Sequence, residues 1–236
     1  MEVHRPKFVK GLIEEILIIV ISISLAVGAE RIVENWVHNK EGKEALINLK
    51  TELIRDSIDL NFNLDIYKET IVGEDLLYKW SRSNYQLSDD SIKSLAELSL
   101  GTVFFANNIS EFESLKFSNK LSYISNHELV QEIVKNYDRY DDFKSSDKGM
   151  STVFYELLSF YRNNTSIVSN EPFSGKALFG LNGKEIKKTL YHDTKFENLL
   201  QVKLWGDKSM KQATIIALSR IRKIITEINK EIREEK

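Results

Sequence analysis

An uncharged apolar run near the amino end constrains this chain more than any other feature. The run covers residues 16–29 and consists almost entirely of Ile, Leu, Val and small residues. As a helix it is about 21 Å long, whereas the hydrocarbon core of a bilayer is about 30 Å thick. Apolar neighbours on both sides, among them Leu12, Ile13 and Trp36, lengthen it past about 30 Å. We therefore expect an uncleaved membrane-spanning helix, with the lipid bilayer as a partner.

Two other classes of segment share this pattern. A cleaved signal peptide has a basic start, an apolar middle and small residues near the cut, such as Gly28 and Ala29. A buried helix of a soluble protein is also apolar, but apolar side chains on every face would need protein all round it. No second run approaches this length, so the sequence favours a single-pass membrane protein.

Orientation in the membrane is only weakly indicated. Lys and Arg flank the run in nearly equal numbers, with Arg5, Lys7 and Lys10 before it and Arg31, Lys40 and Lys43 after it. An amino-terminal signal-anchor helix usually leaves its short basic tail in the cytoplasm. On that ground we expect the soluble part to lie on the extracytoplasmic side.

The rest of the chain has the pattern of helices. Only two prolines occur, at positions 6 and 172, and apolar residues recur at steps of three and four after the run. The sequence predicts an all-α protein in which one N-terminal transmembrane helix continues as a stalk into an antiparallel helical-bundle domain. We divide it into a membrane anchor, residues 1–40, and a helical-bundle domain, residues 41–236.

Turn-forming and capping residues mark the expected ends of the helices. Residues 81–91 are predicted to form a loop, with Asp90 or Ser91 as the cap of a short helix, and Asn126 is a further cap candidate. Residues 171–184 gather one proline and three glycines and are predicted to form the main loop.

The last helix shows two heptads of apolar residues, at Leu218, Ile221, Ile225, Ile228 and Ile232. This spacing fits packing onto the stalk helix of the same chain, and it also fits a coiled coil between chains. The first arrangement is favoured because two heptads are fewer than an independent coiled coil usually shows.

The titratable residues do not form a recognisable catalytic motif. The chain has no Cys, its four His are scattered, and no His-Glu-x-x-His pair occurs, so we expect neither a metal nor another cofactor. Tyr191-His192-Asp193 is the one tight cluster, and a loop or helix-cap role is favoured there because no nucleophile accompanies it. A net charge of −2 gives no indication of nucleic-acid binding.

Two sets of residues near the apolar run are candidate sites. Glu14 and Glu15 could line an ion path in an oligomer, or simply lie among headgroups at a helix N-terminus, which is favoured. Ser22 with Ala26, and Ser24 with Gly28, are pairs of small residues four apart that permit close helix contact in lipid.

Two segments are distinctive: Asn35-Trp36 after the span, and the segment with Glu113, Ser114, Leu115, Lys116 and Ser118. With these segments the chain resembles a bacterial family of N-terminally membrane-anchored, all-helical proteins with no established activity. The resemblance runs with gaps to residues 196–200, and Asn119 stands where the family usually has Gly. It implies an all-helical protein in the bacterial inner membrane and brings no catalytic residues.

These observations lead to a function hypothesis and an alternative. The first is a non-enzymatic membrane protein whose helical domain is an interaction or sensing module, working as a homo-oligomer with a possible protein partner. The alternative is an oligomeric membrane effector or channel whose first helices line a pore.

Overall fold

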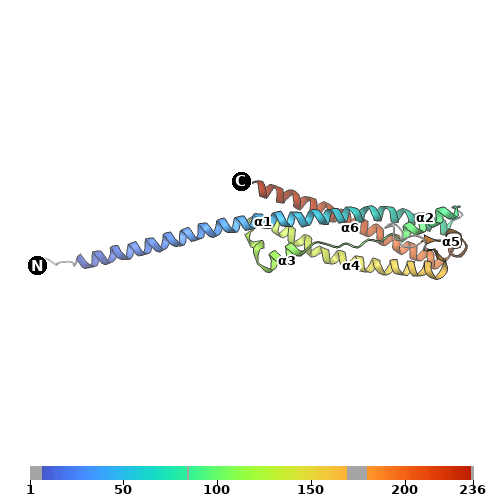
Figure 1. Cartoon of the computed structure of the whole chain (residues 1–236), viewed down its shortest axis with the longest axis horizontal. Coiled ribbons are helices and arrows are strands. Elements are labelled where there is room, and N and C mark those ends of the chain that lie inside the picture. The colour runs from blue at the N-terminus through green and yellow to red at the C-terminus, as the bar shows by residue number, and fades with distance from the viewer. Residues whose placement is uncertain (1–6, 84, 169–179, 235–236) are drawn as a thin grey trace.

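One helix runs through more than half of the molecule's length. The structure, a computed structural model, describes residues 7–83, 85–168 and 180–234. Helix α1 covers Lys7–Arg82, 76 residues, which corresponds to about 114 Å. It leaves the bundle as a bare helix on its amino-terminal side (Figure 1). The expected continuation of the apolar helix as a stalk is confirmed.

The two halves of α1 differ in burial. Residues 15–37 are almost all exposed, and the apolar window reaches a mean hydropathy of 2.3 with none of it buried. Within the described residues, α1 is the one helix long and apolar enough to cross a membrane. From Gly42 onward a regular row of side chains turns inward, including Leu46, Leu49, Leu53 and Leu60.

Gly42 sets the point at which α1 joins the bundle. Its α-carbon packs so closely against the carbonyl of Tyr123 that a methyl group would overlap that carbonyl. One turn earlier, the ring of His38 stacks on the ring of Tyr123, with centroids 4.0 Å apart. Only glycine allows the backbones to approach this closely.

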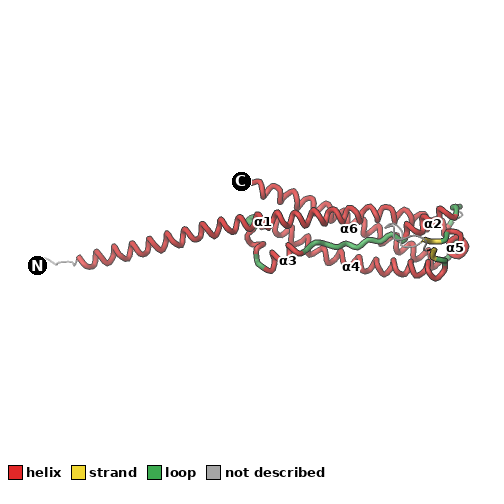
Figure 2. Tube along the Cα trace, viewed as in Figure 1, coloured by secondary structure: helices red, strands yellow, loops and turns green. Residues whose placement is uncertain are grey.

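Beyond α1 the chain turns back along the bundle before it forms the next long helix. Helix α2 covers Asp89–Ser99, and an extended segment, residues 101–109, returns along the outside of the bundle (Figure 2). Helix α3 (Ser110–Phe117) and the 3-10 helix η1 (Lys120–Tyr123) form a corner, and α4 follows over His127–Asn164. The two-residue strands β1 (Ile167–Val168) and β2 (Gly180–Leu181) pair antiparallel, and α5 (Gly183–Leu190) and α6 (Thr194–Glu234) complete the chain.

The extended return makes α1 and α4 parallel. Tyr137 and Tyr140 of α4 bond to Glu52 and Asp56 of α1, so residue numbers rise together along the two helices. Helix α6 runs the other way: its Lys203 bonds to Glu74 near the end of α1, and its carboxy-terminal end lies back toward the middle of α1 (Figure 1). The expected antiparallel bundle therefore does not hold for the α1–α4 pair, because nine extended residues carry the chain back before α4 begins.

The core divides into two apolar clusters. The larger lies between α1, α4 and α6 and includes Leu53, Ile133 and Ile221. The smaller joins the far end of α1 to α2, α5 and the start of α6, around Trp80 and Phe196. Leu218, Ile221 and Ile228 are buried inside the same chain, and Ile225 and Ile232 pack beside them. The heptad row of α6 therefore packs within the chain, as the favoured interpretation had it.

The predicted helix ends are right at some positions and wrong at others. Asn126 caps α4 by accepting from the Leu129 amide at 3.0 Å, as expected. The cap of α2 is Ser88, not Asp90 or Ser91. In the Tyr191-His192-Asp193 cluster, Asp193 accepts from the Phe196 amide at 2.8 Å at the start of α6, the cap role favoured above. The predicted loop at 171–184 lies largely outside the described residues, and α5 begins at Gly183.

Candidate functional site

Polar side chains of α1 reach into the bundle and fasten the returning segment to it. Glu52 is the first of them and is 5% exposed. One of its oxygens accepts from the Ser110 hydroxyl at 2.9 Å and from the Glu111 amide at 2.7 Å. The other accepts from the Phe112 amide at 3.4 Å and from the Tyr137 hydroxyl at 3.2 Å. Glu52 therefore supplies from α1 the N-terminal cap that α3 does not obtain from its own Ile109.

One turn further along α1, Asp56 is fully buried and holds the end of the extended segment. One of its oxygens accepts from the Asn108 amide and from the Asn108 side chain, both at 2.8 Å. Its other oxygen accepts from the Tyr140 hydroxyl at 2.6 Å. From α4, Asp147 accepts from the Phe105 amide at 2.9 Å. Burial raises the pKa of both Asp56 and Asp147, although the hydrogen bonds they accept oppose this.

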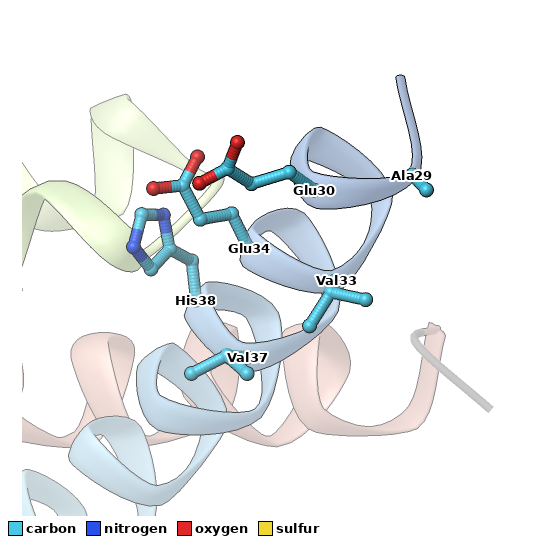
Figure 3. A pocket seen from close by; sticks show the side chains of 6 residues that line it. All are labelled: Ala29, Glu30, Val33, Glu34, Val37 and His38. Carbon is cyan, nitrogen blue, oxygen red and sulfur yellow. The ribbon is translucent and has the colours of Figure 1, made fainter. Parts of the chain in front are cut away.

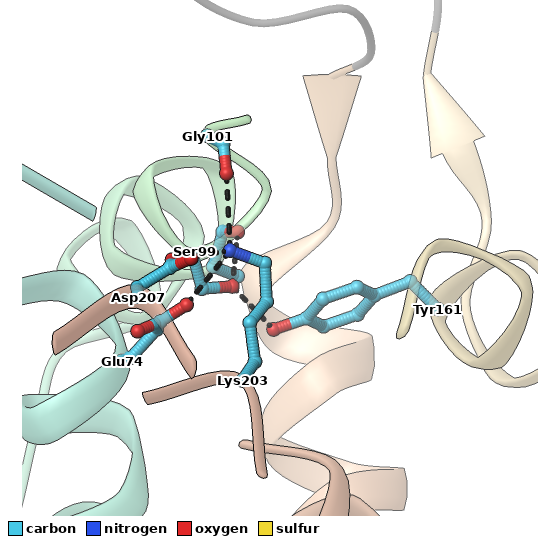
Figure 4. A network of polar contacts seen from close by, with 7 residues as sticks. Glu74, Ser99, Gly101, Tyr161, Lys203 and Asp207 are labelled. Atoms are coloured by element: carbon cyan, nitrogen blue, oxygen red, sulfur yellow. Dashed lines mark hydrogen bonds and ion pairs between the residues drawn. The ribbon is translucent and has the colours of Figure 1, made fainter. Parts of the chain in front are cut away.

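A buried charged cluster joins α1, α6 and the beginning of the extended segment (Figure 4). The Lys203 ammonium donates to Glu74 at 2.8 Å, to Asp207 at 2.7 Å and to the Gly101 carbonyl at 3.0 Å. Lys203 and Glu74 are 1% and 0% exposed. Nearby, the hydroxyl groups of Ser99 and Tyr161 are 3.1 Å apart, which links α2 to α4. Helices α1 and α6 and the extended segment thus meet at one ammonium group.

The charges in this cluster do not balance unless one carboxyl group is protonated. One ammonium faces two carboxyl groups, and the Oε2 atom of Glu74 is buried without a hydrogen-bond partner among the described residues. Burial raises the pKa of Glu74 to about 9, and the charge of Asp207 adds to the effect while Lys203 opposes it. We therefore assign the proton to Glu74 at neutral pH, which leaves the cluster electrically neutral.

These polar contacts tie the extended segment and α6 to α1 inside the bundle. The cluster is closed off from solvent, and the carboxylates of Glu52, Asp56, Asp147 and Asp207 each accept hydrogen bonds from the protein itself. Within the described residues, no group of three or more His, Asp or Glu side chains is placed to hold a metal ion. A groove of ≈ 380 Å³ lies between α1 and the extended segment and is lined in part by Phe62, Asn63 and Phe104.

The predicted small-residue pairs lie on two opposite faces of the apolar half of α1. Ser22 and Ser24 are two residues apart, which is about 200° around a helix. Each pair spans about one turn, so Ala26 stays close to the Ser22 face and Gly28 to the Ser24 face. Ser22, Ser24 and Ala26 are exposed in the single chain and Gly28 is partly so. A flat contact with one neighbouring helix can therefore use one pair or the other.

The two acidic candidates are only partly described. Glu15 is exposed and lies seven residues before Ser22, two turns away on the same face. The side chain of Glu14 lies outside the described residues.

Further along α1, a shallow pocket of ≈ 400 Å³ lies on its outer surface (Figure 3). Ala29, Val33 and Val37 form its apolar side, and Glu30, Glu34 and His38 form the other. All six residues belong to α1. The pocket is therefore a hollow between neighbouring side chains of one helix, and no other described element lines it.

The segment that carries the family resemblance forms the corner of the bundle. Glu113 to Lys116 lie in α3, where Leu115 is buried, and the Ser118 hydroxyl ends the helix by donating to the Ser114 carbonyl at 2.8 Å. Asn119 follows with a φ of 58°, in the left-handed region. Gly and Asn are the residues that adopt this conformation at low cost, so Asn119 fits this turn.

The polar contacts of Glu52, Asp56, Glu74, Lys203 and Asp207 were not foreseen from the sequence. A signal was present, because Asp56 and Glu74 stand at core positions of the row that contains Leu53, Leu60 and Leu77. Charged residues in such a row indicate buried partners.

Comparison with known proteins gives no further assignment. Neither the protein-family models, nor the curated proteins, nor the solved structures contain a match to this chain.

Proposed function

We propose that the chain is a non-enzymatic, single-pass membrane protein whose helical domain serves as an interaction or sensing module and works as a homo-oligomer. The observation that carries the proposal is the continuity of α1. A single helix has a bare apolar amino-terminal half and a carboxy-terminal half that forms the spine of the bundle. A rigid helix of this kind passes a rotation or a tilt from one end to the other.

The way the polar groups are used supports a binding or sensing role over catalysis. Catalytic groups need access to substrate, whereas Glu74 and Lys203 are shut inside the bundle and Asp56 is engaged by three donors. What the bundle offers to the outside is helix surface. Several large apolar side chains lie there, with Trp205 74% and Phe117 86% exposed.

The same helix supports the proposed location in a membrane. With residues 16–29 in the hydrocarbon core, Trp36 and Lys40 lie towards the headgroup region, and the Lys40 ammonium lies 5.8 Å from the centre of the Trp36 ring. We further propose the bacterial inner membrane, on the family resemblance alone, and the extracytoplasmic side for the bundle, on the signal-anchor pattern of the sequence alone.

The mass of the full-length chain in a mild detergent tests the homo-oligomer. Light scattering with the detergent contribution subtracted should give a multiple of the 27.3 kDa chain mass. A chain mass that stays monomeric as protein concentration rises would contradict the proposal. The channel alternative predicts ion currents in planar bilayers that fall on replacing Glu14 and Glu15 by Gln, and we expect no current from the wild type.

A further inference from the structure

The outer face of α1 carries one row of residues that crosses from the apolar half into the bundle half. Steps of three and four lead from Ser22 through the positions beside the pocket of Figure 3 and on to Ile58. The residues of this row, which we call the outer row, are Ser22, Ala26, Ala29, Val33, Trp36, Lys40, Glu44, Ile47, Thr51, Ile54 and Ile58. All of them are exposed in the single chain.

The outer row is straight and points away from the bundle. Ser22 and Ile58 are 36 residues apart (58 − 22), which is about ten turns, so the row does not wind around α1. Leu53 and Leu60 face the core at 0% exposure, while Ile54 and Ile58 on the other side are 41% and 63% exposed. The exposed apolar face of α1 in the bundle, which carries Ile54 and Ile58, is therefore the direct continuation of the Ser22 face of the amino-terminal half.

Residues with apolar side chains dominate this face on both sides of the expected membrane surface. Small residues in lipid permit close helix approach, and exposed isoleucines in water favour burial against a partner. Lys40 and Glu44 interrupt the row, one turn apart and opposite in charge. Beyond Ile58 the same face continues with Phe62, which is 64% exposed, and becomes polar at Asp65, whose side chain is 70% exposed. The apolar part of this face therefore ends at Phe62.

We propose that the outer row is the contact between two copies of this chain, packed in parallel through α1. The proposal rests on the homo-oligomer proposed above and names its interface. A membrane inserts every copy in the same direction, so neighbouring α1 helices lie parallel, with equal residues at equal depth. A parallel copy is therefore the occupant that covers the lipid part and the aqueous part of one straight row together.

The charges agree with this pairing. In a parallel pair, Lys40 of each chain lies about one turn from Glu44 of the other, so each ammonium meets a carboxylate of the partner. The competing face of the apolar half, Ser24 with Gly28, points in the direction of the core of the bundle. A contact through that face would not continue along α1, because α4 and α6 cover the same side further on.

Disulfide formation between single cysteines tests the proposal, since the natural chain contains no Cys. A disulfide requires α-carbons within about 7 Å of each other. We expect Ser22→Cys and Ile58→Cys to form cross-linked dimers in native membranes under mild oxidation. Ser24→Cys and Asp59→Cys are the matched controls, each about 100° to 200° away around the same helix, and should cross-link several-fold less.

The result separates this proposal from the homo-oligomer itself. Cross-links at Ser24 or Asp59 that equal or exceed those at Ser22 and Ile58 would overturn the outer row while the detergent mass still shows an oligomer. Weak cross-links at all four positions in a chain that is oligomeric by mass would also overturn it. A monomeric mass would contradict both proposals.

Discussion

The ammonium group of Lys203 lies 2.8 Å from a carboxyl oxygen of Glu74, and both side chains are buried between α1 and α6. The same ammonium holds Asp207 and the Gly101 carbonyl, so it connects the distal part of α1 to the returning segment. Because burial raises the pKa of Glu74 to about 9 and Asp207 shares the same cation, we assign Glu74 as neutral at physiological pH. The protonation state of this one group therefore contributes to the stability of the distal end of the bundle.

The stability of the protein should fall as pH rises between about 5 and 9. Glu74 has a pKa of about 9 in the folded chain against an ordinary value of 4.5, so within this range the folded state holds one proton more than the unfolded state. The free energy of unfolding then decreases with pH, by up to about 1.4 kcal/mol per pH unit. Burial also raises the pKa of Asp56 and Asp147, which adds to the decrease at the lower end of the range. The pKa of Lys203 is raised above its ordinary value of 10.5, so Lys203 is protonated in both the folded and the unfolded chain between pH 5 and 9. It therefore does not change the predicted decrease in stability.

Replacing Glu74 by Gln isolates this effect. Gln is neutral at every pH and keeps an oxygen for Lys203, so Glu74→Gln should flatten the decrease measured by urea unfolding at several pH values. The equivalent change at the exposed Glu69 should leave the slope as in the wild type. An unchanged slope in Glu74→Gln would show that Glu74 is ionised in the folded protein.

Replacing Lys203 by Met should destabilise the bundle by about 3 kcal/mol or more, because it leaves buried carboxyl groups and the Gly101 carbonyl without their donor. Thermal unfolding followed by circular dichroism measures the loss. Lys208→Met is the control, since Lys208 lies on the exposed side of the same helix and should change stability by less than about 0.5 kcal/mol. Equal melting temperatures for both variants would show that the Lys203 cluster does not stabilise the bundle.

Replacing Asp56 by Ala should release the extended segment. The change leaves the Asn108 amide, the Asn108 side chain and the Tyr140 hydroxyl without their acceptor, at a cost of about 3 kcal/mol. Hydrogen exchange should accelerate first at the amide of Asn108. The neighbouring Arg55→Ala, at an exposed position, should leave that amide protected. Unchanged protection in Asp56→Ala would mean that other contacts hold the segment.

Replacing Ile228 by Asp should destabilise the protein by several kcal/mol, since a carboxylate would enter a site with 0% exposure. Ile216→Asp on the same helix is the comparison, because Ile216 is 49% exposed and its replacement should change stability little. If Ile228→Asp has the melting temperature of the wild type, Ile228 does not pack in the core between α6 and the rest of the bundle.

Apolar periodicity was enough to predict the long elements. Residues 16–29 and the row from Leu46 to Leu64 predicted an apolar helix that continues as a stalk, and Leu218 to Ile232 predicted the packing side of α6. Asn126 predicted the start of α4, because its side chain accepts a hydrogen bond from an amide of the first turn. These features are local, so the sequence determines them over a few turns of helix.

The direction of α4 and the polar contacts of α1 depend on distant parts of the chain. Residues 101–109 form no helix or strand, and their extended path is fixed by Asp56 and Asp147, which are about 40 to 50 residues away along the chain. Glu74 and Lys203 are 129 residues apart. The periodicity of one helix does not indicate which distant residue a buried charge will contact. The sequence could therefore show that these charged residues stand at core positions, but it could not identify their partners.

The reactivity of single cysteines along α1 tests the central claim, that one helix passes from the membrane into the bundle. In sealed native membranes, Ile18→Cys and Leu25→Cys should resist a water-soluble maleimide and react after solubilisation in denaturing detergent, because both positions lie in hydrocarbon. Arg55→Cys, on the exposed surface of the same helix, should react on one side of intact membranes. Ready labelling of Ile18→Cys and Leu25→Cys in intact membranes would contradict the account, since it would place the apolar half of α1 in water.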